Sequence, residues 1–259
     1  MTLASVTVTR YVTPLREGGS LPGIVEGDDL GTYVCKFRGA GQGLRVLVAE
    51  VIVAGLARAL DIPTPDQVVL DLDADIARYE ADEEVQDLIN ASSGLNLGID
   101  FLPSAFGYDA ACEPEPALAG RILWLDALTA NVDRSWRNPN LLVWGGTVQA
   151  IDHGASLYFH HSWPGGAGSP ERFAAQPYDL GEHVLKEYAP QAVEQAGELR
   201  ARLDDATLAT IVEDVPDEWL EPAPGAETPE ALRRRYVDFL RARLDGPRTW
   251  EPAAGGTSA

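Results

Sequence analysis

The sequence predicts an α+β fold of two lobes, with the strands gathered in the first part of the chain and the helices in the second. β-Branched residues alternate with other residues at positions 4–12, which predicts a strand, and a long apolar run follows at 44–60. Beyond residue 180 most segments have helical periodicity. The strands and one helix come first and most helices come later. This order is typical of an α+β chain with a cleft between two lobes.

The length of 259 residues allows one large domain or two lobes with a proper core. We expect a small β-rich N-terminal lobe at 1–103, with a boundary anywhere between 72 and 104, and a mainly helical C-terminal lobe at 104–247. The Gly- and Ala-rich end, 248–259, is expected to be a disordered tail. Helices are expected in the second lobe at 116–130, 180–187, 190–203, 206–212 and 229–244.

The formal net charge of −20 makes nucleic acid and anionic membrane surfaces poor partners. The two cysteines, Cys35 and Cys112, fit neither a zinc pattern nor a disulfide framework, which favours a reducing compartment. The first residues lack the apolar core of a signal peptide, and charged residues interrupt the apolar run at 44–60, which predicts a buried helix and no membrane span. We therefore expect a cytoplasmic protein.

Three antiparallel strands are expected within residues 4–37, joined by glycine-containing loops. Gly18, Gly19 and Ser20 lie in the first loop, where backbone N–H groups can approach a phosphate, although a Gly-Gly pair is more often a plain turn. A strand at 67–72, an acidic, solvated, helix-like segment at 74–94 and an extended piece at 94–105 complete the first lobe.

Lys36 lies in the apolar strand of residues 32–37 and is one of only two lysines among 20 basic residues. One interpretation is an edge-strand or solvent-facing lysine, which limits unwanted sheet pairing. The other is a pair with Glu50, an acid inside the apolar helix, because an ammonium or a carboxylate buried without a partner is costly.

A polar segment at 131–140 follows the helix predicted at 116–130. Two apolar runs around a Gly-Gly turn come next, and Asp152-His153-Gly154 ends the stretch. The hairpin returns Asp152 to the neighbourhood of Asp133, so that two carboxylates and the amides between them predict a magnesium and phosphate site. Taken singly, Asp133 and Arg134 also suit an ion pair near a helix end, and Asp152 suits a turn cap.

Phosphoryl transfer needs a cation on the phosphates, a metal ion held by an acid and an amide, and a carboxylate near the attacking hydroxyl. Lys36, held by Glu50, is the candidate for the phosphates. Asp152 is the candidate metal ligand together with Asn138 or Asn140. For Asp133 we expect the role of orienting or deprotonating the acceptor hydroxyl.

The segment NVDRSWRNPNLLVWGGTVQAIDHG at 131–154 resembles the catalytic loop, hairpin and metal-binding motif of the protein-kinase-like superfamily, and most closely that of the HipA-like kinases. The likeness extends over 11–244: VCKF resembles the strand with the nucleotide lysine, and 47–65 the helix with its glutamate partner. It implies a bilobal protein-kinase-like fold and an ATP- and Mg²⁺-dependent kinase acting on a hydroxyl of a protein or small molecule. Phosphoinositide kinases share a similar motif, which therefore indicates the superfamily better than the substrate.

The sequence departs from the family pattern in three places. Asn138 has the usual spacing of the metal amide after Asp133, but Asn140 directly precedes a hairpin strand; we favour Asn140, because the strand fixes its amide, and keep Asn138 as a close second. The motif at 152–154 is Asp-His-Gly in place of Asp-Phe-Gly, so a phenylalanine switch is not implied. A dense glycine loop is missing from the first lobe, which leaves 17–21 as the expected phosphate cover.

Two other functions remain as alternatives. One is a kinase-fold binding module that holds nucleotide or a protein partner without turnover. The other is a metal-dependent hydrolase built on Asp152, His153 and the pair His160-His161, for which the sequence offers no evident third close ligand.

Overall fold

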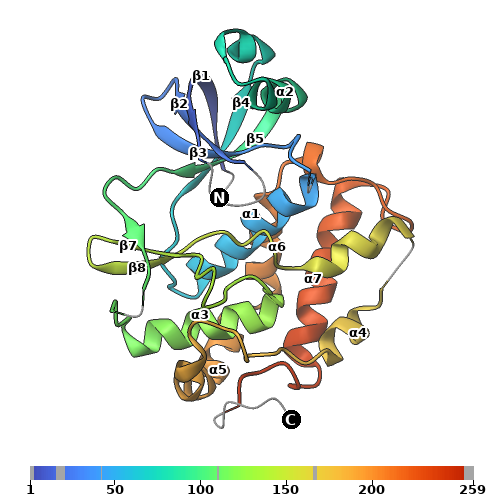
Figure 1. The fold of residues 1–259 in the computed structure, drawn as a ribbon. Coiled ribbons are helices and arrows are strands. Elements are labelled where there is room, and N and C mark those ends of the chain that lie inside the picture. The colour runs from blue at the N-terminus through green and yellow to red at the C-terminus, as the bar shows by residue number, and fades with distance from the viewer. Residues whose placement is uncertain (1–2, 16–20, 42, 110, 166–167, 254–259) are drawn as a thin grey trace. The chain divides into compact units, whose positions relative to one another are not determined.

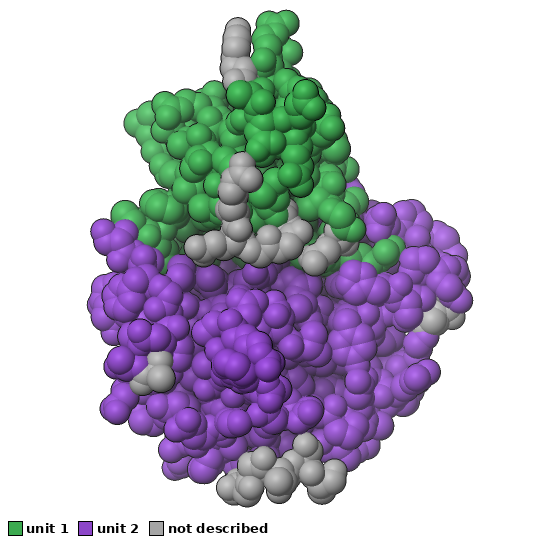
Figure 2. Space-filling model, viewed as in Figure 1, with its two compact units in different colours: residues 1–48, 65–103 green, residues 49–64, 104–259 purple. Residues whose placement is uncertain are grey.

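The computed structural model describes residues 3–15, 21–41, 43–109, 111–165 and 168–253, and the fold is α+β as predicted (Figure 1). It contains two compact units, which Figure 2 distinguishes by colour. Unit 1 comprises residues 1–48 and 65–103, and unit 2 comprises residues 49–64 and 104–259. Unit 2 thus includes residues 49–64 as well as the chain after 103, and the functional lobe limits at 103 and 247 stay a prediction.

Unit 1 is built on a five-stranded closed sheet. Its strands are β1 (Ala4–Pro14), β2 (Gly23–Gly27), β3 (Thr32–Lys36), β4 (Gln67–Leu72) and β5 (Gly94–Asp100). Their order is β1-β2-β3-β5-β4, and β4 pairs in parallel with β1 to close it. The predicted antiparallel arrangement of β1, β2 and β3 is confirmed. Buried and partly exposed residues alternate along the strands, so that one face of the sheet is buried. In β3, for example, Tyr33 and Cys35 are buried and their neighbours are partly exposed.

The acidic segment after β4 forms a 3₁₀ helix, η1 (Ala74–Tyr79), and an α-helix, α2 (Glu83–Ala91). Ala77, Val85 and Ile89 are buried in the core of unit 1. The prediction of a wholly solvated segment is therefore wrong: one apolar edge of this segment covers the sheet, while its carboxylates remain outside.

Helix α1 (Leu44–Ala59) confirms the predicted buried helix. Its part in unit 2 packs closely on α6 (Asp205–Glu213), where a Cβ built on Gly55 would lie 2.6 Å from a side-chain carbon of Ile211. No helix in the described residues combines the length and the apolar character needed to cross a membrane.

The other helices of unit 2 are α3 (Pro116–Thr129), α4 (Pro170–Ala175), α5 (Ala189–Arg202) and α7 (Pro229–Asp245), with 3₁₀ segments η2 (Tyr158–Gly165), η3 (Lys186–Tyr188) and η4 (Asp217–Trp219). Helix α3 packs against α5, and α7 packs against α4 and α6 (Figure 1). The Glu115 side chain caps α3 by accepting hydrogen bonds from the backbone N–H groups of Ala117 and Leu118. These positions confirm the predicted helices at 116–130, 190–203, 206–212 and 229–244.

The predicted hairpin is also confirmed. It consists of β7 (Leu141–Trp144) and β8 (Thr147–Ala150), joined by Gly145 and Gly146 with φ of +57° and +81°. Two residues with positive φ make the tight turn that suits the twist of a hairpin. The short strand β6 (Phe106–Gly107) adds to the free side of β7.

The helix predicted at 180–187 is wrong. The backbone N–H of Trp136 donates to the carbonyl of Glu182 (3.1 Å), and the N–H of Val184 donates to the carbonyl of Arg134 (3.2 Å). A helix would need these N–H and carbonyl groups for its own hydrogen bonds, but here they pair with the polar loop. In this segment helical structure therefore begins only at η3.

The disordered tail predicted from residue 248 is wrong for residues 248–253. Trp250 is 1% exposed, and its indole N–H donates to the carbonyl of Arg243 (2.9 Å). Glu251 forms an ion pair with Arg200. Burial of a large indole against α3 and α7 fixes this part of the chain despite its composition, and 254–259 lie outside the described residues.

Candidate functional site

A fully buried carboxylate, Asp126 in the last turn of α3, organises the polar loop. Its Oδ2 accepts hydrogen bonds from Arg134 Nε (2.6 Å) and His183 Nε2 (3.1 Å), and its Oδ1 accepts one from Asn131 Nδ2 (2.9 Å). Burial by itself raises the pKa of Asp126, but the charge of Arg134 and the hydrogen bond from His183 outweigh it and hold that pKa below its ordinary value.

The tautomer of His183 follows from its two contacts. The backbone N–H of Leu185 donates to His183 Nδ1 (3.0 Å), so Nε2 carries the hydrogen that Asp126 accepts. The ring thereby joins the irregular segment after residue 180 to the end of α3.

Arg134 connects Asp126 to both ends of the hairpin. The guanidinium is buried, and its Nη1 donates to the carbonyls of Asn140 and Ile151, the latter at 3.2 Å. Its Nη2 lies 3.3 Å from Nδ1 of His153 and donates to it, since a guanidinium has no acceptor. One side chain therefore fixes the residue before β7 and the residues after β8.

Asp133 sits next to this buried centre but is only half-buried. Its backbone N–H donates to Asn131 Oδ1 (3.0 Å), which sets the loop. Its Oδ2 accepts from Asn138 Nδ2 (2.9 Å) and from Asn140 Nδ2 (3.2 Å). Among the described residues, neither amide oxygen of these two asparagines accepts a hydrogen bond, so both remain as possible metal ligands.

The hairpin brings Asn140 and Asp152 to the same end of its ladder. Beyond the last strand pair, the N–H of Ile151 donates to the carbonyl of Asn140 (3.1 Å), and Asp152 follows directly. Both have positive φ, +48° at Asn140 and +54° at Asp152. Asn and Asp adopt this conformation more readily than other non-glycine residues, and such strained positions cluster at functional sites.

Asn138 has a different setting. It is exposed and belongs to the turn in which the backbone N–H of Ser135 donates to its carbonyl (3.0 Å). The strand start therefore fixes Asn140 more firmly than the exposed turn fixes Asn138.

Glu50, the acid of α1, is 1% exposed. Its Oε2 accepts a hydrogen bond from the backbone N–H of His153 (3.0 Å). Within unit 2 the carboxylate predicted to serve the phosphate lysine thus contacts the segment that carries Asp152. The predicted ion pair of Glu50 with Lys36 joins residues of different units and stays a prediction.

Lys36 lies at the end of β3, which pairs with β2 on one side and with β5 on the other. The edge-strand interpretation is therefore wrong. The side chain is half-buried and points away from the face that buries Tyr33 and Cys35. The other predicted phosphate contacts, Gly18, Gly19 and Ser20, lie outside the described residues.

The histidines do not build the metal centre that a hydrolase requires. In η2 the Nδ1 of His160 lies 3.0 Å from the Tyr236 hydroxyl, and its Nε2 lies 3.3 Å from Nε2 of His161. In the part of the chain that the structure describes, no three His, Cys, Asp or Glu side chains come together as a metal-binding group.

A family model described as HipA-like kinase matches residues 8–252. The chain belongs to the HipA-like kinase family. No curated protein is similar enough to count as a match. The predicted family is therefore confirmed by a match that spans nearly the whole chain.

Among solved structures, this HipA-like kinase chain is similar to the proinflammatory kinase CtkA of Helicobacter pylori, with a TM-score of 0.59, 11% identity and 98% of each chain covered. The Golgi casein kinase matches with a TM-score of 0.39 and 13% identity over 94% of this chain and 72% of that one. The same kinase with Mn/ADP bound matches with a TM-score of 0.39 and 13% identity, over 94% and 73%. The first similarity shows a protein-kinase-like fold, and fold and family together support a kinase function.

Sequence reasoning missed Asp126 and His183, the two residues that hold Arg134 in place. Asp126 had a readable signal, because it lies within a helix that is otherwise almost wholly apolar, as Glu50 does in α1. His183 had none, since its segment was predicted to be a helix and its partner Asp126 is distant in the sequence.

Proposed function

We propose that this HipA-like kinase transfers the γ-phosphate of ATP, with Mg²⁺, to a hydroxyl of a protein or small molecule. The observation that carries the proposal is the geometry around Arg134, which holds the Asp133 loop, Asn140 and the Asp152 segment against one buried carboxylate. A constellation fixed in this way costs little reorganisation during transfer.

We assign the metal to Asp152 and Asn140. Carboxylate and amide oxygens are ligands that Mg²⁺ accepts, and Asn140 turns its amide nitrogen toward Asp133, which leaves its oxygen for a cation. Asn138 is the second candidate for the amide ligand. When bound, the metal neutralises charge on the phosphates.

Asp133 takes the role of the carboxylate at the acceptor. The acceptor oxygen attacks the γ-phosphorus, and the bond between that phosphorus and the bridging oxygen of ADP breaks as ADP leaves with the electron pair. The hydroxyl proton passes to Asp133, whose half-buried carboxylate is oriented by the amides of Asn138 and Asn140.

Units 1 and 2 correspond, in this proposal, to the two lobes of a kinase. The family resemblance assigns the phosphates to Lys36, supported by Glu50, and their cover to Gly18, Gly19 and Ser20. Lys36 is half-buried in a strand that is paired on both sides, so it does not serve to prevent pairing at a sheet edge. This position is compatible with binding of a phosphate.

The test uses the full chain with Mg-ATP and two measurements, thermal stabilisation by nucleotide and formation of ADP or phosphoprotein. Asp152→Ala is expected to lose the Mg²⁺-dependent stabilisation. Asp133→Ala keeps it but transfers phosphate about 10²- to 10⁴-fold more slowly. Asp87→Ala, which removes an exposed acid of α2, is the matched control and should behave as the wild type.

Two results would contradict the proposal in different ways. Mg-ATP could stabilise both the wild type and Asp133→Ala while neither forms ADP or phosphoprotein. The chain would then be a nucleotide-binding module without turnover. A wild-type chain that neither Mg-ATP nor Mn-ATP stabilises is no nucleotide-dependent enzyme.

A further inference from the structure

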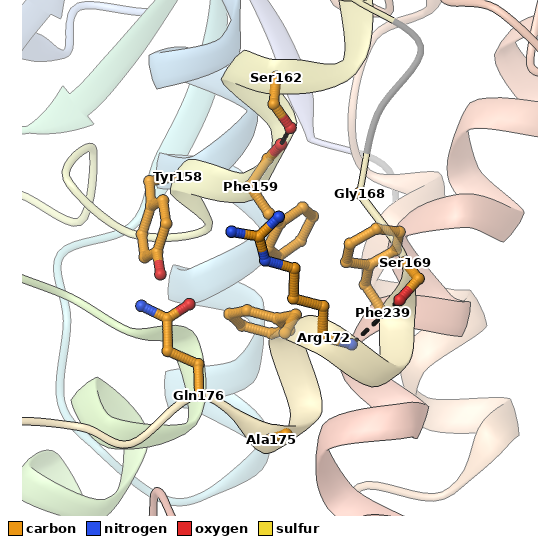
Figure 3. A pocket seen from close by; sticks show the side chains of 10 residues that line it. Tyr158, Phe159, Ser162, Gly168, Ser169, Arg172, Ala175, Gln176 and Phe239 are labelled. Atoms are coloured by element: carbon orange, nitrogen blue, oxygen red, sulfur yellow. Dashed lines mark hydrogen bonds between the residues drawn. The ribbon is translucent and has the colours of Figure 1, made fainter.

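Unit 2 contains a cavity of about 680 Å³ outside the constellation of Asp133 and Asp152. Its apolar wall consists of three phenylalanines contributed by η2, α4 and α7 (Figure 3). The rings of Phe159 and Phe239 stack with centroids 4.4 Å apart, and Phe159 lies 4.6 Å from Phe173. A cavity of this size with an aromatic wall is suited to a large apolar group.

Polar groups converge on the same cavity. Figure 3 shows the Tyr158 hydroxyl and the Gln176 amide pointing toward each other. The hydroxyl oxygen is buried, and within the described residues it has no hydrogen-bond partner. Buried hydroxyls are normally paired, so the unpaired hydroxyl of Tyr158 is a distinctive feature of this cavity wall.

Arg172 adds a positive charge. Its side chain extends from α4 across the cavity toward Phe159 (Figure 3), and none of the described side chains forms an ion pair with it. Such a guanidinium next to an apolar wall favours an anionic group on the ligand.

A second cavity of about 390 Å³ adjoins the first and shares Gly168 and Phe239 with it. Arg234, Arg235 and Asp238 line it. Arg235 is engaged, since its Nη2 donates to the carbonyl of Pro224 (2.7 Å). The guanidinium of Arg234 is exposed and, among the described residues, forms no ion pair, so it provides a second site for an anion.

Three contacts connect the first cavity to the loop that carries Asp133 and to the end of α3 before it. The Tyr178 hydroxyl, just after the cavity wall at Gln176, donates to the carbonyl of Asn131 (2.7 Å). Buried Arg243 donates to the carbonyls of Gln176 (3.0 Å) and Ala127 (2.9 Å), the latter next to Asp126 in α3. The cavity wall and the loop are therefore parts of one hydrogen-bonded framework.

From this framework we infer that the two cavities bind the acceptor, an extended peptide segment with a large apolar side chain and neighbouring acidic side chains. The inference rests on the proposed kinase function. The apolar side chain fills the first cavity, while carboxylates bind Arg172 and Arg234. Two adjoining cavities, one mainly apolar and one polar and cationic, suit an extended chain better than a single compact molecule.

The experiment measures binding of fluorescent peptides to the full chain without nucleotide, by anisotropy. The probe peptide contains a serine, a phenylalanine and several glutamates; one comparison peptide has lysines in place of the glutamates, and another has alanine in place of the phenylalanine. The wild type is expected to bind the acidic peptide about tenfold or more tightly than either comparison peptide. The double variant Arg172→Glu, Arg234→Glu reverses the preference between acidic and basic peptides, while Arg248→Glu, an exposed arginine outside both cavities, keeps it.

Mg-ATP stabilisation of the same samples separates this inference from the proposed function. Equal affinity for acidic and basic peptides, or an unchanged preference in the double variant, overturns the acceptor site even when Mg-ATP binds normally. A small aromatic carboxylate that binds as tightly as the acidic peptide also overturns it, because the ligand is then a small molecule. If the chain binds the acidic peptide preferentially but Mg-ATP does not stabilise it, the cavities are a peptide site. Only the kinase proposal is then contradicted.

Discussion

Two aspartates close in the sequence, Asp126 and Asp133, have opposite settings in the structure. Asp126 is fully buried, and a guanidinium, an imidazole and an amide satisfy its two oxygens. Asp133 is half-buried, and within the described residues its carboxylate accepts hydrogen bonds from the amides of Asn138 and Asn140. The first carboxylate is fixed by charge, whereas the second stays accessible to a ligand.

The difference explains how a short loop combines a fixed backbone with an accessible carboxylate. A carboxylate with a lowered pKa and saturated oxygens is a poor proton acceptor, so Asp126 is suited to positioning Arg134. The hydrogen bonds around Asp126 and Arg134 also fix the backbone of Asp133, but the Asp133 carboxylate is not buried as that of Asp126 is. A change at one of these aspartates, or at the residues around it, leaves the other aspartate as the reference.

The largest effect is expected from Asp126→Ala. The change leaves the buried guanidinium of Arg134 without a carboxylate, which typically costs about 3–5 kcal/mol. Urea unfolding is the measurement, and Asp133→Ala, which removes a half-buried acid, is the comparison and should lose about 1 kcal/mol or less. Equal losses in the two variants would remove the distinction between a structural and a reactive carboxylate.

The next effect concerns the two amides beside Asp133. Asn140→Gly removes the predicted metal ligand and tolerates the positive φ at this position, so backbone strain is avoided. The Mg²⁺ concentration for half-maximal stabilisation by ATP is expected to rise about tenfold or more. Asn138→Gly, in the exposed turn, should change it less, and the reverse order would assign the metal to Asn138.

The smallest effect is expected from pH, because Asp126 remains ionised across the neutral range. Its folded pKa lies below its unfolded value of about 3.9, so its ionised form adds stability above that pH, and this contribution is lost as the pH falls toward the folded value. Urea unfolding of the wild type and of Asp126→Asn at several pH values measures it. Their difference should be constant near neutrality and shrink below about pH 4; a constant difference down to strongly acidic pH would contradict it.

Local pattern was sufficient for the hairpin and for most helices. Gly145 and Gly146 between two apolar runs specify a two-residue turn, and the apolar run of α1 specifies a buried helix. Local pattern failed where distant groups competed for the main chain. Glu182 and Val184 pair with the loop around Arg134 instead of forming a helix, and Trp250 anchors a segment whose composition suggests disorder.

The sequence alone determined the α+β class and the order of Asp133, the amides and Asp152, because strand alternation, helical periodicity and turn chemistry act over short distances. The HipA-like family came from the resemblance of the motif at 131–154. Only the tertiary structure revealed that Asp126 and His183 hold Arg134, and that Glu50 contacts the backbone of His153. The physical reason is that a buried charge takes its partners from whatever elements pack around it, and those elements meet only after the chain has folded.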